Sequence, residues 1–248
     1  MRFFGIVVFS LISMCGLSAE ENFFLIDIND GKDLLQIGPQ IDRRVSPCST
    51  FKIALSLIGF DSEILKNENS PTWNFQEGYD DYLESWKEPQ TPQSWLKHSC
   101  VWYSKVMVSH LGSEIVQKYL DAFEYGNRNI SGGLTNAWLS SSLKISPREQ
   151  VSFIQRMLQK DLPVSNYSVD MTKSLLLLEV LPNGWKLFGK TGLGHIKQNL
   201  EIGWFIGWIE RDGQCFVFAY NICKKKVEVD RRIPRVKELL AKVIDIDI

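Results

Sequence analysis

Histidine is scarce in this 248-residue sequence, which contains only His98, His110 and His195. The three do not stand at a metal-ligand spacing, and the cysteines form no CxxC pair, so the signature of a zinc site is lacking. None of the histidines lies in a recognisable triad motif. This argues against Ser-His-Asp chemistry.

An excess of charge of one sign is also lacking. The chain has 28 basic and 29 acidic residues, and no stripe of lysine and arginine. The electrostatic footprint of nucleic-acid binding is therefore absent, and no nucleic-acid partner is expected. No internal repeat, low-complexity tract or linker rich in Pro, Gly or Ser interrupts the chain. We expect one compact domain over residues 20–248.

Long apolar runs are missing except at the start. Arg2 precedes "FFGIVVFSLISMCGL", which is short for a membrane span, and small residues follow up to Ala19. This pattern predicts a secretory signal peptide over residues 1–19. A retained anchor is less favoured because no basic stop-transfer cluster follows. A lipoprotein processed at Cys15 is weaker still, because Met14 stands where a small residue is needed. We expect a periplasmic or secreted protein with no membrane contact after cleavage.

Four cysteines remain after such cleavage, at positions 48, 100, 215 and 223. An even number in an exported protein permits disulfides, and the sequence leaves open whether any of them form. Cys48 is interpreted as a small packing residue.

The pattern of the chain predicts an α+β fold. "NDG" between two apolar segments, 22–28 and 32–38, indicates a hairpin, and residues 185–192, 202–210 and 215–222 indicate three strands joined by turns. Helices are expected from Ser46 to about Gly59, and over 113–123, 146–158, 169–180 and 232–244. The segment 91–112 is also expected to be helical, with a loop in part of it as the alternative. We predict one antiparallel sheet built from both chain ends, with a helical region inserted between them.

One expected helix raises a chemical question. Ser49 and Lys52 share a face near its N-terminus, where unpaired backbone N–H groups can stabilise an oxyanion. Burial and the positive helix end both lower the pKa of the lysine. A neutral amine beside a serine is a candidate base, although S-x-x-K alone is a common pattern.

Other motifs strengthen the interpretation of Ser49 and Lys52 as a catalytic pair. "KTG" at 190–192 lies in a late strand, where a basic group and a hydroxyl can bind a carboxylate and Gly192 lets a substrate lie alongside. Ser104 in "WYSKV", "YGN" at 125–127 and Trp138 in "AWLSSSLKIS" complete the set. S-x-x-K with KTG is the signature of penicillin-interacting serine enzymes.

"PCSTFK", "SKV", "YGN", "NISGG…AWLSSSLKIS" and "KTG", in this order, closely resemble the class D (oxacillinase-type) serine β-lactamases. The resemblance covers essentially the whole chain after residue 19. It implies the serine β-lactamase and penicillin-binding transpeptidase-like fold. It also implies hydrolysis of β-lactam antibiotics, and hence antibiotic resistance.

The resemblance implies a role for each catalytic residue. Ser49 would be the acylated nucleophile, and Lys52 would be N-carboxylated by CO2 and act as general base, with no other cofactor and no metal. Ser104 would relay a proton toward the leaving nitrogen. Val106 would shelter the modified lysine, and Trp138 would donate its indole N–H to it.

The resemblance also implies a set of substrate contacts. Lys190 and Thr191 would bind the substrate carboxylate, beside Gly192, and the N–H groups of Ser49 and Leu193 would form the oxyanion hole. An arginine near the last helix would help to bind the carboxylate; Arg231 and Arg232 are both candidates, and Arg232 is favoured.

Other classes fit less well. Tyr125 and Asn127 also match the Y-x-N of class C enzymes, but the preceding S-K-V and the Trp138 segment argue against that class, and Tyr125 is expected to be structural. The lack of "SDN" and of a class A-type glutamate motif argues against class A.

Two functions besides hydrolysis stay open. One is a β-lactam sensor, which would need membrane helices before the domain; the other is a penicillin-binding peptidase that stays acylated. The sequence leaves the substrate range open, as well as the choice between monomer and homodimer.

We expect Ser49→Ala to abolish acylation and leave the fold intact, because one short side chain near a helix start replaces another. Mass spectrometry after exposure to a penicillin should show a covalent adduct on the unmutated protein only. An adduct mapped to a different serine would overturn the assignment.

Overall fold

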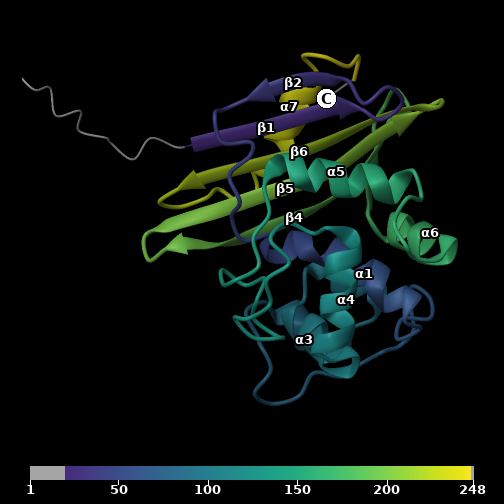
Figure 1. The fold of residues 1–248 in the computed structure, drawn as a ribbon, viewed down its shortest axis with the longest axis vertical. Helices are drawn as coiled ribbons and strands as arrows, with labels where there is room; N and C mark the ends of the chain where they lie inside the picture. Colours follow the sequence, from purple (N-terminus) through teal and green to yellow (C-terminus); the bar gives the residue numbers. More distant parts are fainter. Residues whose placement is uncertain (1–19, 247–248) are drawn as a thin grey trace, which may run out of the picture.

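The computed structural model describes residues 20–246, so the expected signal peptide at 1–19 lies outside the described residues. A six-stranded antiparallel sheet with the order β2-β1-β6-β5-β4-β3 forms the centre of the molecule (Figure 1). The strands are β1 Glu20–Asp27, β2 Asp33–Ile37, β3 Leu177–Val180, β4 Lys186–Lys197, β5 Leu200–Arg211 and β6 Gln214–Lys224.

The two ends of the chain meet in this sheet. The N-terminal strand β1 pairs with β6, which is the last strand of the chain, and the helical region between β2 and β3 lies to one side (Figure 1). The described helices are η1 Cys48–Phe51, α1 Lys52–Asp61, η2 Glu84–Trp86, α2 Pro92–His98, α3 Val101–Leu111, α4 Ser113–Phe123, α5 Pro147–Leu158, α6 Asn166–Leu175 and α7 Arg232–Leu240. The predicted α+β fold, with a sheet from both chain ends, is confirmed.

Each face of the sheet carries its own apolar core, because alternate strand side chains point to opposite faces. Phe23 and Leu25 pack with α7 residues such as Leu239. Phe24 and Ile26 belong to the larger core, which includes the helical region. The sheet is therefore covered on both faces, and its β4 strand is held beside the helices that carry the S-x-x-K motif.

Local sequence signals account for several elements. The "NDG" hairpin lies where it was predicted, between β1 and β2, and "RDGQ" forms the turn between β5 and β6. Ser146 and Glu149 form a capping box at the start of α5, in which each side chain accepts a hydrogen bond from the other residue's backbone N–H.

Three element boundaries differ from the prediction. The helix expected from Ser46 begins with the 3-10 turn η1 at Cys48, and α1 starts at Lys52. The helix expected over 91–112 is two helices, because Ser99 adopts a left-handed conformation (φ 57°) between α2 and α3. The helix expected over 169–180 ends at Leu175, and Leu177–Val180 pairs with β4 as an edge strand. In each case tertiary packing decides the boundary over local propensity.

Across residues 20–246 the structure contains no helix with the length and apolarity needed to cross a membrane.

Candidate active site

Ser49 lies in the short turn η1, directly before α1. The preceding residue, Cys48, has a left-handed backbone (φ 50°), an unusual conformation for a residue other than glycine, asparagine or aspartate. The Cys48 N–H donates to the carbonyl of Trp138 at 3.1 Å, which ties this turn to the loop that carries Trp138. The serine is thereby presented at the start of a buried helix.

Strand β4 runs against this turn so closely that side chains are excluded. A Cβ on Gly192 would lie 3.0 Å from the carbonyl oxygen of Pro47 and 3.3 Å from the backbone nitrogen of Ser49. A Cβ on Gly194 would meet the Cys48 sulfur at 2.5 Å. Glycine is required at both positions because the strand and the turn share one narrow contact.

Lys52 is fully buried, on the first turn of α1. Its Nζ donates a long hydrogen bond of 3.4 Å to the hydroxyl oxygen of Ser49. Burial lowers the pKa of Lys52 to about 8, and the nearby Cys100, Cys48 and Asp80 counteract this only in part. The amine is therefore available in its neutral form near physiological pH.

Trp138 reaches the same place from the loop before α5. Its ring packs on Phe51, with the centroids 5.5 Å apart, and Ser46 holds its carbonyl with a hydroxyl hydrogen bond of 2.7 Å. The indole N–H of Trp138 is buried and finds no acceptor among residues 20–246. A buried donor without a partner costs folding free energy. An anionic or polar acceptor beside this N–H would remove that cost.

These residues fit a lysine modified by CO2. The amine of Lys52 has a lowered pKa and Trp138 offers an unused donor. Val106 is half-buried in the middle of α3, where it lines a hollow with Tyr79 and Asp80. Modification of Nζ by CO2 requires a neutral amine and gives an anion, and the unused donor is what such an anion needs.

Ser104 is completely buried on α3, and its surroundings were not foreseen. Its hydroxyl oxygen accepts a 2.8 Å hydrogen bond from the indole N–H of Trp95 and donates a longer one, 3.4 Å, to the carbonyl of Cys100. No sequence pattern pointed to Trp95, because it belongs to the preceding helix and the break at Ser99 removes any helical spacing between Trp95 and Ser104.

Lys190 on β4 is almost wholly buried, with 6% of its surface exposed. Its ammonium donates to the hydroxyl of Ser99 at 3.0 Å and to the carbonyl of Thr191 at 3.1 Å. Burial holds the pKa of Lys190 well below its usual range, and the charges of Lys52 and Arg232 lower it further. Ser99 is the second contact that sequence analysis missed.

The two candidate arginines lie differently. The Arg232 guanidinium is buried and donates to the backbone carbonyls of Gly192 at 2.5 Å and Val229 at 3.0 Å. Arg231 is exposed and lies 3.8 Å from Glu238. Of the two, only Arg232 is brought to the "KTG" segment. Leu193, two residues after Thr191, is exposed beside it.

Tyr125 and Asn127 have structural surroundings. Tyr125 is buried, with its ring 5.3 Å from that of Phe51. Asn127 donates to the carbonyl of Ser142 and accepts from the N–H of Lys144. The pair therefore holds the turn that leads to the Trp138 loop.

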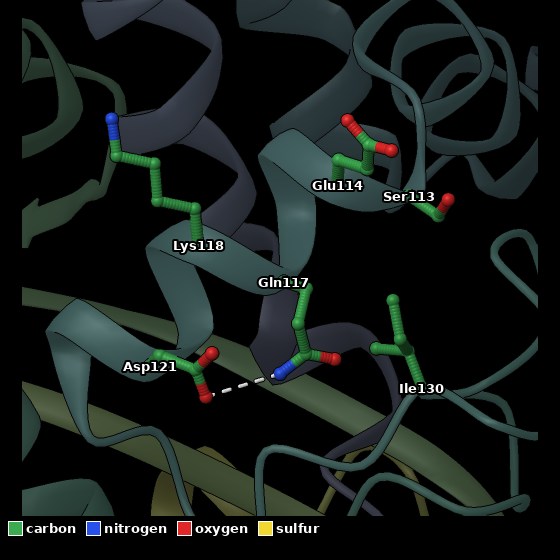
Figure 2. A pocket seen from close by; sticks show the side chains of 6 residues that line it. All are labelled: Ser113, Glu114, Gln117, Lys118, Asp121 and Ile130. Atoms are coloured by element: carbon green, nitrogen blue, oxygen red, sulfur yellow. Dashed lines mark hydrogen bonds between the residues drawn. The ribbon is translucent and has the colours of Figure 1, made fainter.

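The remaining cysteines and a surface hollow offer no competing site. Cys48, Cys100, Cys215 and Cys223 are all free thiols. A hollow of about 620 Å³ lies over α4, lined by Ser113, Glu114, Gln117, Lys118, Asp121 and Ile130 (Figure 2). Within it the side-chain amide of Gln117 donates to the carboxylate of Asp121 at 3.1 Å, while Lys118 points away from both.

A serine, a buried amine, a second buried lysine and a glycine-bearing strand edge define the site of a penicillin-interacting serine enzyme. Residues 23–244 match the family model of the penicillin-binding protein transpeptidase domain.

The relatives narrow this class. The chain is 38% identical over 220 residues to β-lactamase OXA-9 of Klebsiella pneumoniae, covering 83% of this chain and 80% of that protein. It is 38% identical over 210 residues to β-lactamase OXA-1 of Escherichia coli, covering 81% and 75%. The crystal structure of the class D β-lactamase OXA-427 superposes with a TM-score of 0.84 at 35% identity, over 90% of this chain and all of that one. The chain belongs to the class D β-lactamase family.

A sensor protein is also similar, but only in part. The methicillin resistance mecR1 protein of Staphylococcus aureus is 33% identical over 210 residues, which cover 82% of this chain and 35% of the longer protein. The shared segment is thus a minor part of the sensor.

We expect Lys52→Met to raise the free energy of unfolding in CO2-free buffer at about pH 6, by roughly 3 kcal/mol. A pKa lowered from 10.5 to about 8 means that the folded state is penalised for holding the ammonium. The gain should be full below about pH 8 and should shrink as pH rises toward 10.5, because the unfolded chain then holds the proton that the folded state has released.

Urea denaturation at several pH values measures this difference. Lys118→Met, on the exposed face of α4, is the matched control and should change stability by less than about 0.5 kcal/mol. A destabilised Lys52→Met protein at about pH 6 would show that the folded state does not carry this burial cost.

Proposed function

We propose that this protein hydrolyses β-lactam antibiotics through an acyl-enzyme on Ser49, with Lys52 modified by CO2 as the general base. One observation carries the proposal: the hydroxyl of Ser49 lies 3.4 Å from a buried amine of lowered pKa. The unpartnered indole N–H of Trp138, whose ring packs on the adjacent Phe51, supports it. A serine and a base at this spacing form an activated nucleophile.

Three residues would hold the modification. Lys52 provides the nitrogen, Trp138 the hydrogen-bond donor and Val106 an apolar wall. CO2 bound at Nζ supplies an anionic oxygen that can accept the serine proton and later activate water. No metal is part of the proposal, and within residues 20–246 no three His, Cys, Asp or Glu side chains lie together as a metal site.

In the reaction, the oxygen of Ser49 attacks the lactam carbonyl. The backbone N–H groups of Ser49 and Leu193 stabilise the oxyanion, and a donor of this kind contributes roughly 3 kcal/mol. The hydroxyl of Ser104 relays a proton to the leaving lactam nitrogen. The N–H of Trp95 on the oxygen of Ser104 fixes the position of that hydroxyl, and the proton would have to leave its long hydrogen bond to the carbonyl of Cys100 to be donated.

The substrate carboxylate binds at the cationic end of β4. Lys190 and Thr191 contact it, and Gly192 lets the substrate lie along the strand. Arg232 adds positive charge from α7 and holds the carbonyl of Gly192. Burial and the neighbouring Arg232 disfavour the ammonium of Lys190, and a bound carboxylate would favour it.

We also propose that residues 1–19 are a signal peptide and that the mature enzyme acts in the periplasm or outside the cell, where it confers antibiotic resistance. The composition of this segment supports export.

Steady-state hydrolysis of nitrocefin tests the proposal. Activity should fall as pH drops below about 8, because Lys52 becomes an ammonium that cannot take up CO2, and added bicarbonate should recover it. Lys52→Ala should resist recovery. Rapid acylation without turnover would indicate a sensor or a penicillin-binding protein. If bicarbonate leaves turnover unchanged from acid to neutral pH, and Lys52 carries no carbamate carbon signal in NMR with labelled CO2, the modification is excluded.

The donor from Trp138 can be tested separately with Trp138→Phe, which removes the N–H and keeps an aromatic ring. We expect this variant to need about ten- to a hundredfold more bicarbonate for half-maximal activity, since a hydrogen bond to an anion is lost. The carbamate signal should weaken in parallel. Trp208→Phe is the matched control, because that indole N–H bonds to Glu210 instead. An equal bicarbonate requirement in both variants would contradict the role of Trp138.

A further inference from the structure

Ser99 stands at the break between α2 and α3, with its backbone in the left-handed region (φ 57°, ψ 32°). This conformation ends α2 and lets α3 start again at Val101. It also directs the Ser99 hydroxyl to the ammonium of Lys190, 91 residues further along the chain, at 3.0 Å. A glycine would satisfy the backbone more easily, so the side chain is kept at a conformational cost.

The surroundings of Lys190 show why this hydroxyl matters. Among residues 20–246, Ser99 is the only side chain that accepts a hydrogen bond from the ammonium, and the second acceptor is the carbonyl of Thr191 at 3.1 Å. Ser104 is engaged with Trp95 and with the carbonyl of Cys100. The ammonium is thus held by two neutral oxygens and by no carboxylate.

A lysine ammonium has three N–H donors. Two are directed at Ser99 and at the carbonyl of Thr191, so the third is left to point at a ligand. We propose that Ser99 is a positioning residue that holds the ammonium of Lys190 in place for the carboxylate of the substrate. This inference rests on the proposed function and deepens it, since sequence analysis assigned no role to Ser99.

The charge state of Lys190 depends on the same contact. Burial, the unmodified Lys52 on α1 and Arg232 on α7 all disfavour the ammonium. Once Lys52 is modified by CO2, burial and Arg232 still oppose it. The thiols of Cys48 and Cys100, which lie near Lys52, have pKa values raised to about 11 by burial and are neutral at physiological pH. A hydroxyl that accepts from the ammonium favours the charged form. Its removal lowers the pKa of Lys190 further.

Three variants at position 99 separate the effect of the hydroxyl from the effect of the backbone conformation. Ser99→Gly removes the oxygen and suits the left-handed conformation, whereas Ser99→Ala removes it and strains the backbone. Ser99→Asn tolerates the conformation and keeps an oxygen acceptor. A role limited to the backbone predicts that Gly behaves as well as Ser, and that Ala is the impaired variant.

The test is the pH dependence of kcat/KM for benzylpenicillin at saturating bicarbonate. We expect Ser99→Gly and Ser99→Ala to raise KM about tenfold or more and to move the alkaline limb of the profile to lower pH, while Ser99→Asn restores part of both. The penicillin methyl ester, which lacks the carboxylate, should be hydrolysed by Ser99→Gly as well as by the unmutated enzyme. Introduced into Lys190→Ala, Ser99→Gly should have no further effect.

A Ser99→Gly enzyme with the KM and alkaline limb of the unmutated protein would overturn the positioning role. So would an equal loss toward the acid and its methyl ester. An unmutated protein that fails to turn over either substrate, or nitrocefin, would instead refute the proposed function. Urea denaturation of each variant separates loss of fold from loss of binding.

Discussion

The burial of the Lys52 amine beside Ser49 is the constraint on which the rest of the site depends. A fully buried lysine is unfavourable as an ammonium, and no carboxylate among the described residues pairs with it. The neighbouring residues are mostly apolar: Phe51 precedes Lys52, and the residues of α1 that follow it are buried. Such an environment lowers the pKa of the amine and opens it to chemistry that an exposed lysine does not undergo.

The sheet forms the opposite wall of the site. Gly192 and Gly194 let β4 approach the turn that carries Ser49 to within backbone contact distance. The same strand brings Lys190 into the site, and α7 behind it adds Arg232. The molecule thus brings the buried basic groups of β4 and α7 together next to the Lys52 amine, and burial and Arg232 both lower the pKa of Lys190. A bound anion would favour the charged form of Lys190, which is a physical basis for a preference for anionic ligands.

Neutral side chains organise this pocket. Ser46 fixes the loop at Trp138, Trp95 orients Ser104, and Ser99 contacts Lys190. A hydroxyl can stabilise a donor or a charge at short range without introducing a second charge of its own. Serine and tryptophan side chains therefore perform the positioning that carboxylates perform in many other sites.

The sequence by itself determined the motifs and the local structure. Ser49 and Lys52 are only three positions apart, so the chain places both at one helix start. "NDG" and the Ser146 capping box likewise define their own turn and cap. These features depend on neighbours within a few positions, so local rules predict them.

Only the tertiary structure decided which distant groups meet. The contact of Ser99 with Lys190 spans 91 residues and follows from a left-handed break that no helical periodicity reveals. The choice between Arg231 and Arg232 depends on which side of the first turn of α7 faces β4. The unpartnered N–H of Trp138 depends on how a loop packs on Phe51. Long-range packing fixes these contacts. A single sequence shows which residue types are present, but not which distant residues pack together.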